Sequence, residues 1–158
     1  METSPHLQAR RQAFRLLSLR ARSEKEIRDR LAQKHGPRIA EEVIRQFRTE
    51  GFVDDNAFAR ERARQLAVNH LAGNRAIETD LLQKGIERSI AAAAIATARE
   101  ELSEADAVKI LIGKKRPLQM SLPDRKWKER TARFLMARGF PTGLIYEGLN
   151  DRLFYTDC

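Results

Sequence analysis

Residues 48–59 read RTEGFVDDNAFA, and this stretch predicts that one helix ends and another begins within it. Gly51 has no Cβ atom, so it can adopt the left-handed backbone conformation that commonly closes a helix. Asp54 or Asp55 can then accept hydrogen bonds from the free amides at the start of the next helix. The stretch is therefore expected to join two helices through a short turn.

Three large apolar side chains occur at this joint, where an ordinary loop is polar. They are Phe52 and Val53 after the glycine and Phe58 near the start of the new helix. Removing such side chains from water stabilises a fold. We therefore expect all three to be largely buried between two packed helical units.

The pattern before this joint returns after it at an offset of fifty residues. Matching apolar residues occur in two helices on either side of a shared loop: Ala9, Ala13, Leu16, Ile27 and Leu31 correspond to Ala59, Ala63, Leu66, Ile77 and Leu81. A third copy follows residue 102 and carries about ten extra residues between its first two helices. A constant offset across two helices indicates an internal repeat.

The fold class predicted from this repeat is all-α, with three tandem three-helix repeats over residues 1–53, 54–102 and 103–158. The composition agrees, because strong helix formers dominate and only 8 Gly and 5 Pro occur along the 158 residues. Hydrophobic residues make up 42% of the chain but aromatic residues only 6%. Such a composition favours thin helical layers over one large core.

Cysteine usage and the chain start bear on the compartment. The single cysteine, Cys158, excludes an internal disulfide and suits a reducing compartment. The first residues lack the apolar core of a signal peptide, and no run approaches the ~20 apolar residues that span a bilayer. We therefore expect a cytoplasmic protein that does not enter a membrane.

The charge balance favours an acidic partner. The chain has 30 Lys and Arg against 22 Asp and Glu, a net charge of +8, and its first and third repeats carry the excess. The candidate contact residues lie in a predicted long basic loop, at the helix start that follows it and on the first helix: Lys114, Lys115 and Arg116, then Arg125, Lys126 and Lys128, and Arg10, Arg11 and Arg15. The alternative for each cluster is a solvated surface without a partner.

Catalytic patterns find little support in the sequence. The three histidines, His6, His35 and His70, lie far apart and have no metal-ligand spacing or cysteine partner. No glycine-rich phosphate loop is present, and the adjacent acids Asp54 and Asp55 are expected to cap a helix rather than hold a metal. We therefore expect a protein that is not an enzyme and uses no metal or cofactor.

Several stretches resemble one bacterial family. Residues 51–59, read GFVDDNAFA, and residues 84–86, read KGI, look like the signature of the RecX family of regulatory proteins. Residues 23–31 fit the family's first unit and residues 133–140 its third, so the resemblance extends from about residue 8 to residue 153. The most specific part is the Gly-x-x-Asp-Asp-x-x-Phe-Ala pattern at the joint.

This resemblance implies an elongated, curved array that binds the RecA recombinase, lies in the groove of its filament on DNA and restrains its activities. RecA on DNA is thus the implied partner, the chain would act as a monomer, and weak direct contact with DNA is compatible with this role. Family members often carry a basic residue, glycines and a proline before the second helix of the middle unit. Here residues 69–74 read NHLAGN, which departs from that pattern.

Two other functions are compatible with a basic helical array. One is a DNA-binding protein whose helix-turn-helix-like units place recognition helices in the major groove. The other is a helical scaffold whose basic surface only keeps it soluble. The sequence speaks against base readout, because no helix start concentrates Arg, Asn and Gln as a base-reading set.

Overall fold

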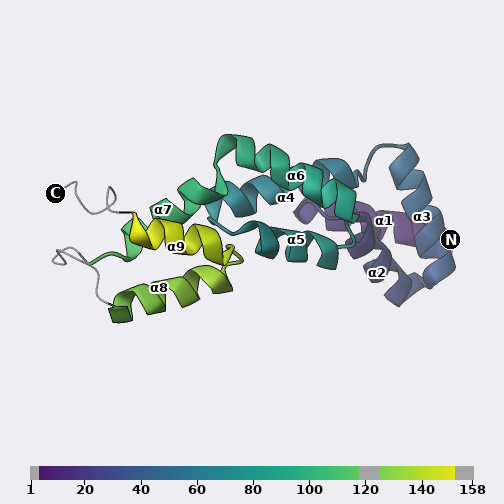
Figure 1. Ribbon diagram of the computed structural model, residues 1–158. Coiled ribbons are helices and arrows are strands. Elements are labelled where there is room, and N and C mark those ends of the chain that lie inside the picture. The colour runs from purple at the N-terminus through teal and green to yellow at the C-terminus, as the bar shows by residue number, and fades with distance from the viewer. Residues whose placement is uncertain (1–3, 118–124, 152–158) are drawn as a thin grey trace.

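The structure is a computed structural model that describes residues 4–117 and 125–151, and all regular structure in these ranges is helical. The helices form three groups that follow one another along an elongated, curved array (Figure 1). The first and third groups lie at opposite ends of this array. The predicted fold class, all-α with three tandem three-helix repeats, is confirmed.

The first group consists of α1 (Pro5–Leu19), α2 (Glu24–His35) and α3 (Pro37–Thr49). The second consists of α4 (Asp55–Arg64), which continues into a π-helical turn at Gln65–Asn69, α5 (Asn74–Gln83) and α6 (Arg88–Glu101). The third consists of α7 (Glu104–Lys115), α8 (Arg125–Ala137) and α9 (Thr142–Asn150).

Each group buries its own hydrophobic core. Phe47 fills the first core, where Ile27 and Leu31 pack from α2. The second core is built largely from alanines of α4 and α6, whose small side chains let the two helices approach closely. Trp127 and Phe140 fill the third core. Three small cores replace one large core, as the low aromatic content predicts.

Local hydrogen bonds set the helix boundaries. A capping box begins α2, because Ser23 Oγ accepts from the Glu26 amide and Glu26 Oε2 accepts from the Ser23 amide. At the joint after α3, Gly51 has the expected positive φ of 78°. Asp54 then caps α4 by accepting from the Ala57 amide at 3.1 Å.

The expected burial of the three apolar residues at this joint is only partly correct. Val53 is buried and Phe58 is half-buried against the second core, but Phe52 keeps 47% of its surface exposed. The turn at Gly51 directs Phe52 toward the first group, where its ring centroid lies 4.9 Å from that of Phe14. Phe52 therefore covers the first core from outside and is not buried between two groups.

The groups are joined through their second helices, which follow one another head to tail. Ser23 Oγ, at the start of α2, donates to the Lys84 carbonyl at the end of α5, at 2.6 Å. The Gly73 amide, at the start of α5, donates to the Arg138 carbonyl at the end of α8, at 2.8 Å. The same end-to-end contact therefore recurs at both joints.

A carboxylate supports each of these contacts. Asp55, the first residue of α4, accepts from the Glu24 amide at 2.9 Å. Glu104, the first residue of α7, accepts from the Asn74 amide at 2.8 Å. The acidic residue that begins the first helix of each following group thus satisfies a free amide at the start of a second helix in the preceding group.

Residues 69–74, which depart from the family pattern, belong to the second joint. Leu71 has a positive φ of 52°, which is uncommon for a residue other than glycine, and its side chain is buried in the core of the third group. Arg138 donates hydrogen bonds to the carbonyls of His70 and Leu71, and Arg99 donates to the Ala72 carbonyl at 2.6 Å. The segment therefore fastens the second group to the third.

Close backbone packing explains why the residue that matches Ser23 is a glycine at this joint. A Cβ atom on Gly73 would lie 2.3 Å from the carbonyl carbon of Gly139, which itself has φ 88°. Real Cβ atoms do not approach other atoms so closely, so a side chain at residue 73 would force the two groups apart.

We predict that Leu71→Ala lowers the free energy of unfolding by about 2 kcal/mol or more, because it leaves a cavity in the third core. Both residues have a Cβ atom, so the backbone strain at this position is retained. Chemical denaturation measures the change. The matched control is Leu19→Ala, since Leu19 is 71% exposed and its truncation should cost within about 0.5 kcal/mol. Equal effects of the two substitutions would contradict the assigned role of Leu71.

Candidate functional site

The basic residues of the third group lie partly on helices rather than in a loop. Lys114 and Lys115 were expected in a long loop, but α7 continues through Lys115 because Gly113 remains helical. Arg116 is the C-cap residue. Lys114 is exposed, whereas the Lys115 ammonium lies 4.1 Å from the centroid of the Phe134 ring. The remainder of the expected loop, residues 118–124, lies outside the described residues.

The helix start expected near Arg125 is confirmed. Arg125 Nε pairs with Glu129 at 2.8 Å, Lys126 is exposed, and Lys128 Nζ donates to Asn150 Oδ1 at 3.2 Å. Arg130 and Arg133 are also exposed on α8, although neither was among the predicted contact residues. Arg130 follows Lys126 by four residues and Arg133 follows Arg130 by three, and this spacing predicts that all three lie on one helix face.

The three arginines of α1 are divided by the fold. Arg10 is engaged inside the first group, where it pairs with Glu50 at 3.1 Å and lies 5.2 Å from the centroid of the Phe47 ring. Arg11 and Arg15 are exposed and line a shallow groove of about 400 Å³ together with Lys34. Only Arg11 and Arg15 of these three are therefore available to an external partner.

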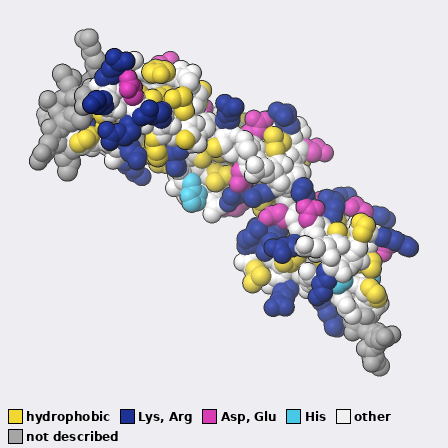
Figure 2. Space-filling model, turned by 90° about the horizontal axis from the view of Figure 1, so that it is seen from below, with side chains coloured by type: hydrophobic (Ala, Val, Ile, Leu, Met, Phe, Trp, Pro, Cys, Tyr) yellow, Lys and Arg dark blue, Asp and Glu magenta, His cyan; other side chains and the backbone are white. Residues whose placement is uncertain are grey.

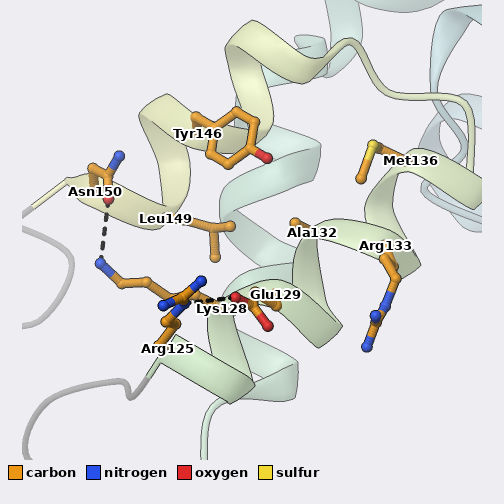
Figure 3. Close-up of a pocket in the computed structure, with 9 residues that line it drawn as sticks. All are labelled: Arg125, Lys128, Glu129, Ala132, Arg133, Met136, Tyr146, Leu149 and Asn150. Atoms are coloured by element: carbon orange, nitrogen blue, oxygen red, sulfur yellow. Dashed lines mark hydrogen bonds and ion pairs between the residues drawn. The ribbon is translucent and has the colours of Figure 1, made fainter.

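A second groove of about 580 Å³ lies between α8 and α9 (Figure 3). Its apolar lining includes Ala132 and Leu149, together with Met136 and Tyr146, which are 40% and 54% exposed. Basic side chains also line it: Arg125, Lys128 and Arg133, with Glu129 the acidic member. The groove therefore combines apolar contact surface with a net positive charge.

The two ends of the array differ from its middle in their free cations. In the middle group, Arg62 pairs with Asp80 at 2.8 Å and Arg64 pairs with Glu101 at 2.8 Å. Figure 2 shows Lys and Arg side chains gathered mainly over the two ends of one face. Most cations available for external contact thus lie on the first and third groups, although Arg60 and Arg75 of the middle group are also exposed.

Ionic contacts shift the pKa of several carboxyl groups in the array. Two hydrogen bonds from Arg48 lower the pKa of Glu24, and two from Arg62 lower the pKa of Asp80. Burial raises the pKa of Asp55, although its hydrogen bond from the Glu24 amide acts in the opposite direction. The carboxylates of Glu24 and Asp80 therefore stabilise the fold in their charged forms.

In residues 4–117 and 125–151, no three His, Cys, Asp or Glu side chains are grouped so that they could hold a metal ion. His35 instead forms a hydrogen bond with Gln12 at 2.8 Å, linking α2 to α1. None of the helices in these ranges has both the length and the apolar character to cross a membrane.

We predict that Asp80→Asn lowers the free energy of unfolding by about 1 kcal/mol at pH 7, because it removes the charge that Arg62 binds. The folded-state pKa of Asp80 is below its ordinary value of about 3.9, so its contribution is present above that pH and is lost as the pH falls. The difference between the two proteins should therefore shrink below about pH 4. Urea unfolding between pH 7 and pH 2 measures it.

The matched control for this prediction is Asp29→Asn. Asp29 also pairs with a cation, Lys25, at 2.6 Å, but its side chain is 59% exposed. Its substitution should change the free energy of unfolding by no more than about 0.5 kcal/mol at pH 7. A difference between wild type and Asp80→Asn that stays constant from pH 7 to pH 2 would contradict the assigned role of Asp80.

Comparisons with known proteins match the chain over its three groups. The models of the first, second and third three-helix domains of RecX match residues 9–47, 54–95 and 103–149. The regulatory protein RecX of Syntrophotalea carbinolica is 34% identical over 146 residues, which cover 91% of this chain and 95% of that protein. The regulatory protein RecX of Corynebacterium efficiens is 33% identical over 156 residues, covering 92% and 74%.

Solved structures show the same arrangement. The crystal structure of RecX from Lactobacillus salivarius superposes with a TM-score of 0.80 at 20% identity, covering 93% of this chain and 96% of that one. A second crystal structure of a regulatory protein RecX superposes with a TM-score of 0.77 at 26% identity, covering 93% and 72%.

Proposed function

The chain belongs to the RecX family of regulatory proteins, and from this premise we propose that it binds the RecA recombinase filament on DNA and inhibits its ATPase, strand-exchange and coprotease activities. Through this inhibition it would modulate DNA repair and the SOS response. The protein would act in the cytoplasm as a monomer, and its three units would divide at residues 1–53, 54–102 and 103–158. It would perform no catalysis of its own.

The observation that carries this proposal is the separation of two cationic surfaces by joined helical groups. Arg11 and Arg15 are exposed on the first group, and Lys126, Arg130 and Arg133 are exposed on the third. The repeated head-to-tail contacts hold these surfaces at a set spacing along the array. A filament presents its acidic groups at repeating intervals, so a spaced pair of basic surfaces suits it better than a single basic patch does.

The alternative, a protein that reads DNA through helix-turn-helix-like units, is less well supported by the third helices of the second and third groups, although α3 of the first group exposes Arg45 and Gln46. In such units a recognition helix presents Arg, Asn or Gln to base edges. The exposed face of α6 instead presents Ala92, Ala93 and Ala96, and the exposed face of α9 presents Tyr146 and Glu147. Neither face offers a base-reading set of side chains.

We expect the protein to inhibit ATP hydrolysis by RecA on single-stranded DNA at amounts below those of the recombinase. An inhibitor that acts on a filament affects many subunits from each site where it binds, so the loss should depend on dose but need no equimolar protein. Coupled ATPase assays and electron microscopy of filament length measure the effect. No inhibition, together with tight binding to bare duplex DNA, would favour the helix-turn-helix alternative instead.

A combined Lys114→Ala, Lys115→Ala and Arg116→Ala variant should inhibit more weakly without unfolding. These residues lie on the outer end of α7, and the loss of the contact between Lys115 and the Phe134 ring should cost about 1 kcal/mol of stability or less. If they bind DNA phosphates, each lost contact lowers the slope of log affinity against log salt by roughly 0.7 to 0.9. Filament binding across a salt series measures this slope.

The corresponding double variant of the first group, Arg11→Ala with Arg15→Ala, tests which of the two basic surfaces contacts the filament. Both residues are exposed on α1, so the substitutions should leave the fold intact. If inhibition and salt slope are unchanged in the α7 variant but reduced in this one, the contact surface lies on the first group. The α7 cluster would then be a solvated surface.

A further inference from the structure

A groove recurs at each joint between two groups, and the following group supplies part of its lining. At the second joint, a groove of about 920 Å³ is lined by α5 and α6 and by Gly139, Phe140 and Thr142 of the third group. At the first joint, a groove of about 560 Å³ is lined by α2 residues and by Gly85, Glu87 and Ile90 of the second group.

The segments that enter these two grooves share the same local structure. Each is the turn after a second helix, and each begins with a glycine of positive φ, 77° at Gly85 and 88° at Gly139. A large buried apolar residue follows directly, Ile86 in one case and Phe140 in the other. The element that docks at a joint is therefore a helix end closed by glycine and followed by an apolar side chain.

The groove between α8 and α9 occupies the corresponding place in the third group. Gly85 corresponds to Gly139, and the same register pairs the lining of the second joint with the lining of this groove. Asn74, Arg75, Glu78, Ala92, Ile95 and Ala96 correspond to Lys128, Glu129, Ala132, Tyr146, Leu149 and Asn150. Among the described residues, however, only α8 and α9 line this third groove.

We propose that the α8–α9 groove binds a partner protein through a helix end of the same kind, closed by glycine, followed by an apolar residue and carrying acidic side chains. The apolar residue would rest against the exposed side chains of Met136 and Tyr146, above the buried Ala132 and Leu149. The acidic side chains would meet Lys128 and Arg133, which give the groove its positive charge. This inference rests on the proposed function, in which the partner is the recombinase.

Charge and sequence argue against a second copy of this chain as the occupant. The free turn of the same kind in the first group lies at residues 34–38, read KHGPR. Its Lys34 and Arg38 would meet the cations of the groove, and Pro37 stands where the internal joints have a large apolar residue. Two copies would therefore bring like charges together without the apolar anchor.

The lining also favours a protein over a nucleic acid. Glu129 lies in the groove and pairs with Arg125 at 2.8 Å, so a phosphate chain would meet a carboxylate there. An extended apolar lining is of little use to a phosphate backbone, whereas a helix that packs into a groove buries such a surface.

The test compares three variants of the full chain in RecA binding and ATPase inhibition. Arg133→Glu and Tyr146→Ala alter two exposed groove residues, and each is expected to weaken binding about tenfold or more, as anchor residues of interfaces do. Lys109→Glu is the control, since it makes an equal change of charge at an exposed residue of α7 in the same group, and Lys109 neither lines the groove nor belongs to the proposed contact residues. It should retain nearly wild-type inhibition, and circular dichroism should show that all three variants fold.

The outcomes separate this inference from the proposed function. Inhibition by wild type that persists in both groove variants, or is lost equally in Lys109→Glu, would overturn the groove assignment and leave the proposed function standing. Absence of inhibition by wild type would overturn both. A photo-crosslinking residue placed at position 146 identifies the occupant directly. A crosslink to an acidic helix end of RecA is expected, and a crosslink to DNA or to a second copy would overturn the inference.

Discussion

The array depends on one recurring contact, in which the amino end of one group's second helix meets the carboxyl end of the next group's second helix. At the second joint the Gly73 amide reaches the Arg138 carbonyl directly, and at the first joint the Ser23 hydroxyl supplies the donor to Lys84. The head-to-tail alignment of the helix dipoles favours this order, because a partly positive amino end faces a partly negative carboxyl end. Three small cores that would be marginal alone are thereby held as one body.

Much of this architecture could be predicted from the sequence because its signals are local. Gly51 and the Ser23 capping box act within a few residues of themselves, and the fifty-residue offset reveals the repeat without knowledge of any contact. Phe52 was misplaced because its neighbours in space, Phe14 and Phe47, come from helices whose packing no local pattern records. The end of α7 was misplaced because a glycine can remain helical where the chain has no stronger signal to stop.

The candidate surface was harder to predict than the fold, since charge in a sequence does not show which cations the fold already uses. Arg10 pairs with Glu50, forty residues away, whereas Arg11 beside it remains exposed. The α8–α9 groove could not be recognised from charge at all. Its role is recognised by comparing the linings of the two joint grooves with the lining of the α8–α9 groove. Among the described residues, no segment of another group enters the α8–α9 groove.

The joints also bear on how freely such a sequence can diverge. Many of their partners are main-chain amides and carbonyls, so few side chains are irreplaceable there apart from the Ser23 hydroxyl and the carboxylates of Asp55 and Glu104. Sequence divergence can then alter most of the surface, while the glycine turns and the acidic first residues of α4 and α7 keep the units in register. A crystal structure that is only 20% identical in sequence but superposes with a TM-score of 0.80 agrees with so small a number of constrained side chains. The protein can thus change its binding surfaces one unit at a time while its overall geometry is inherited intact.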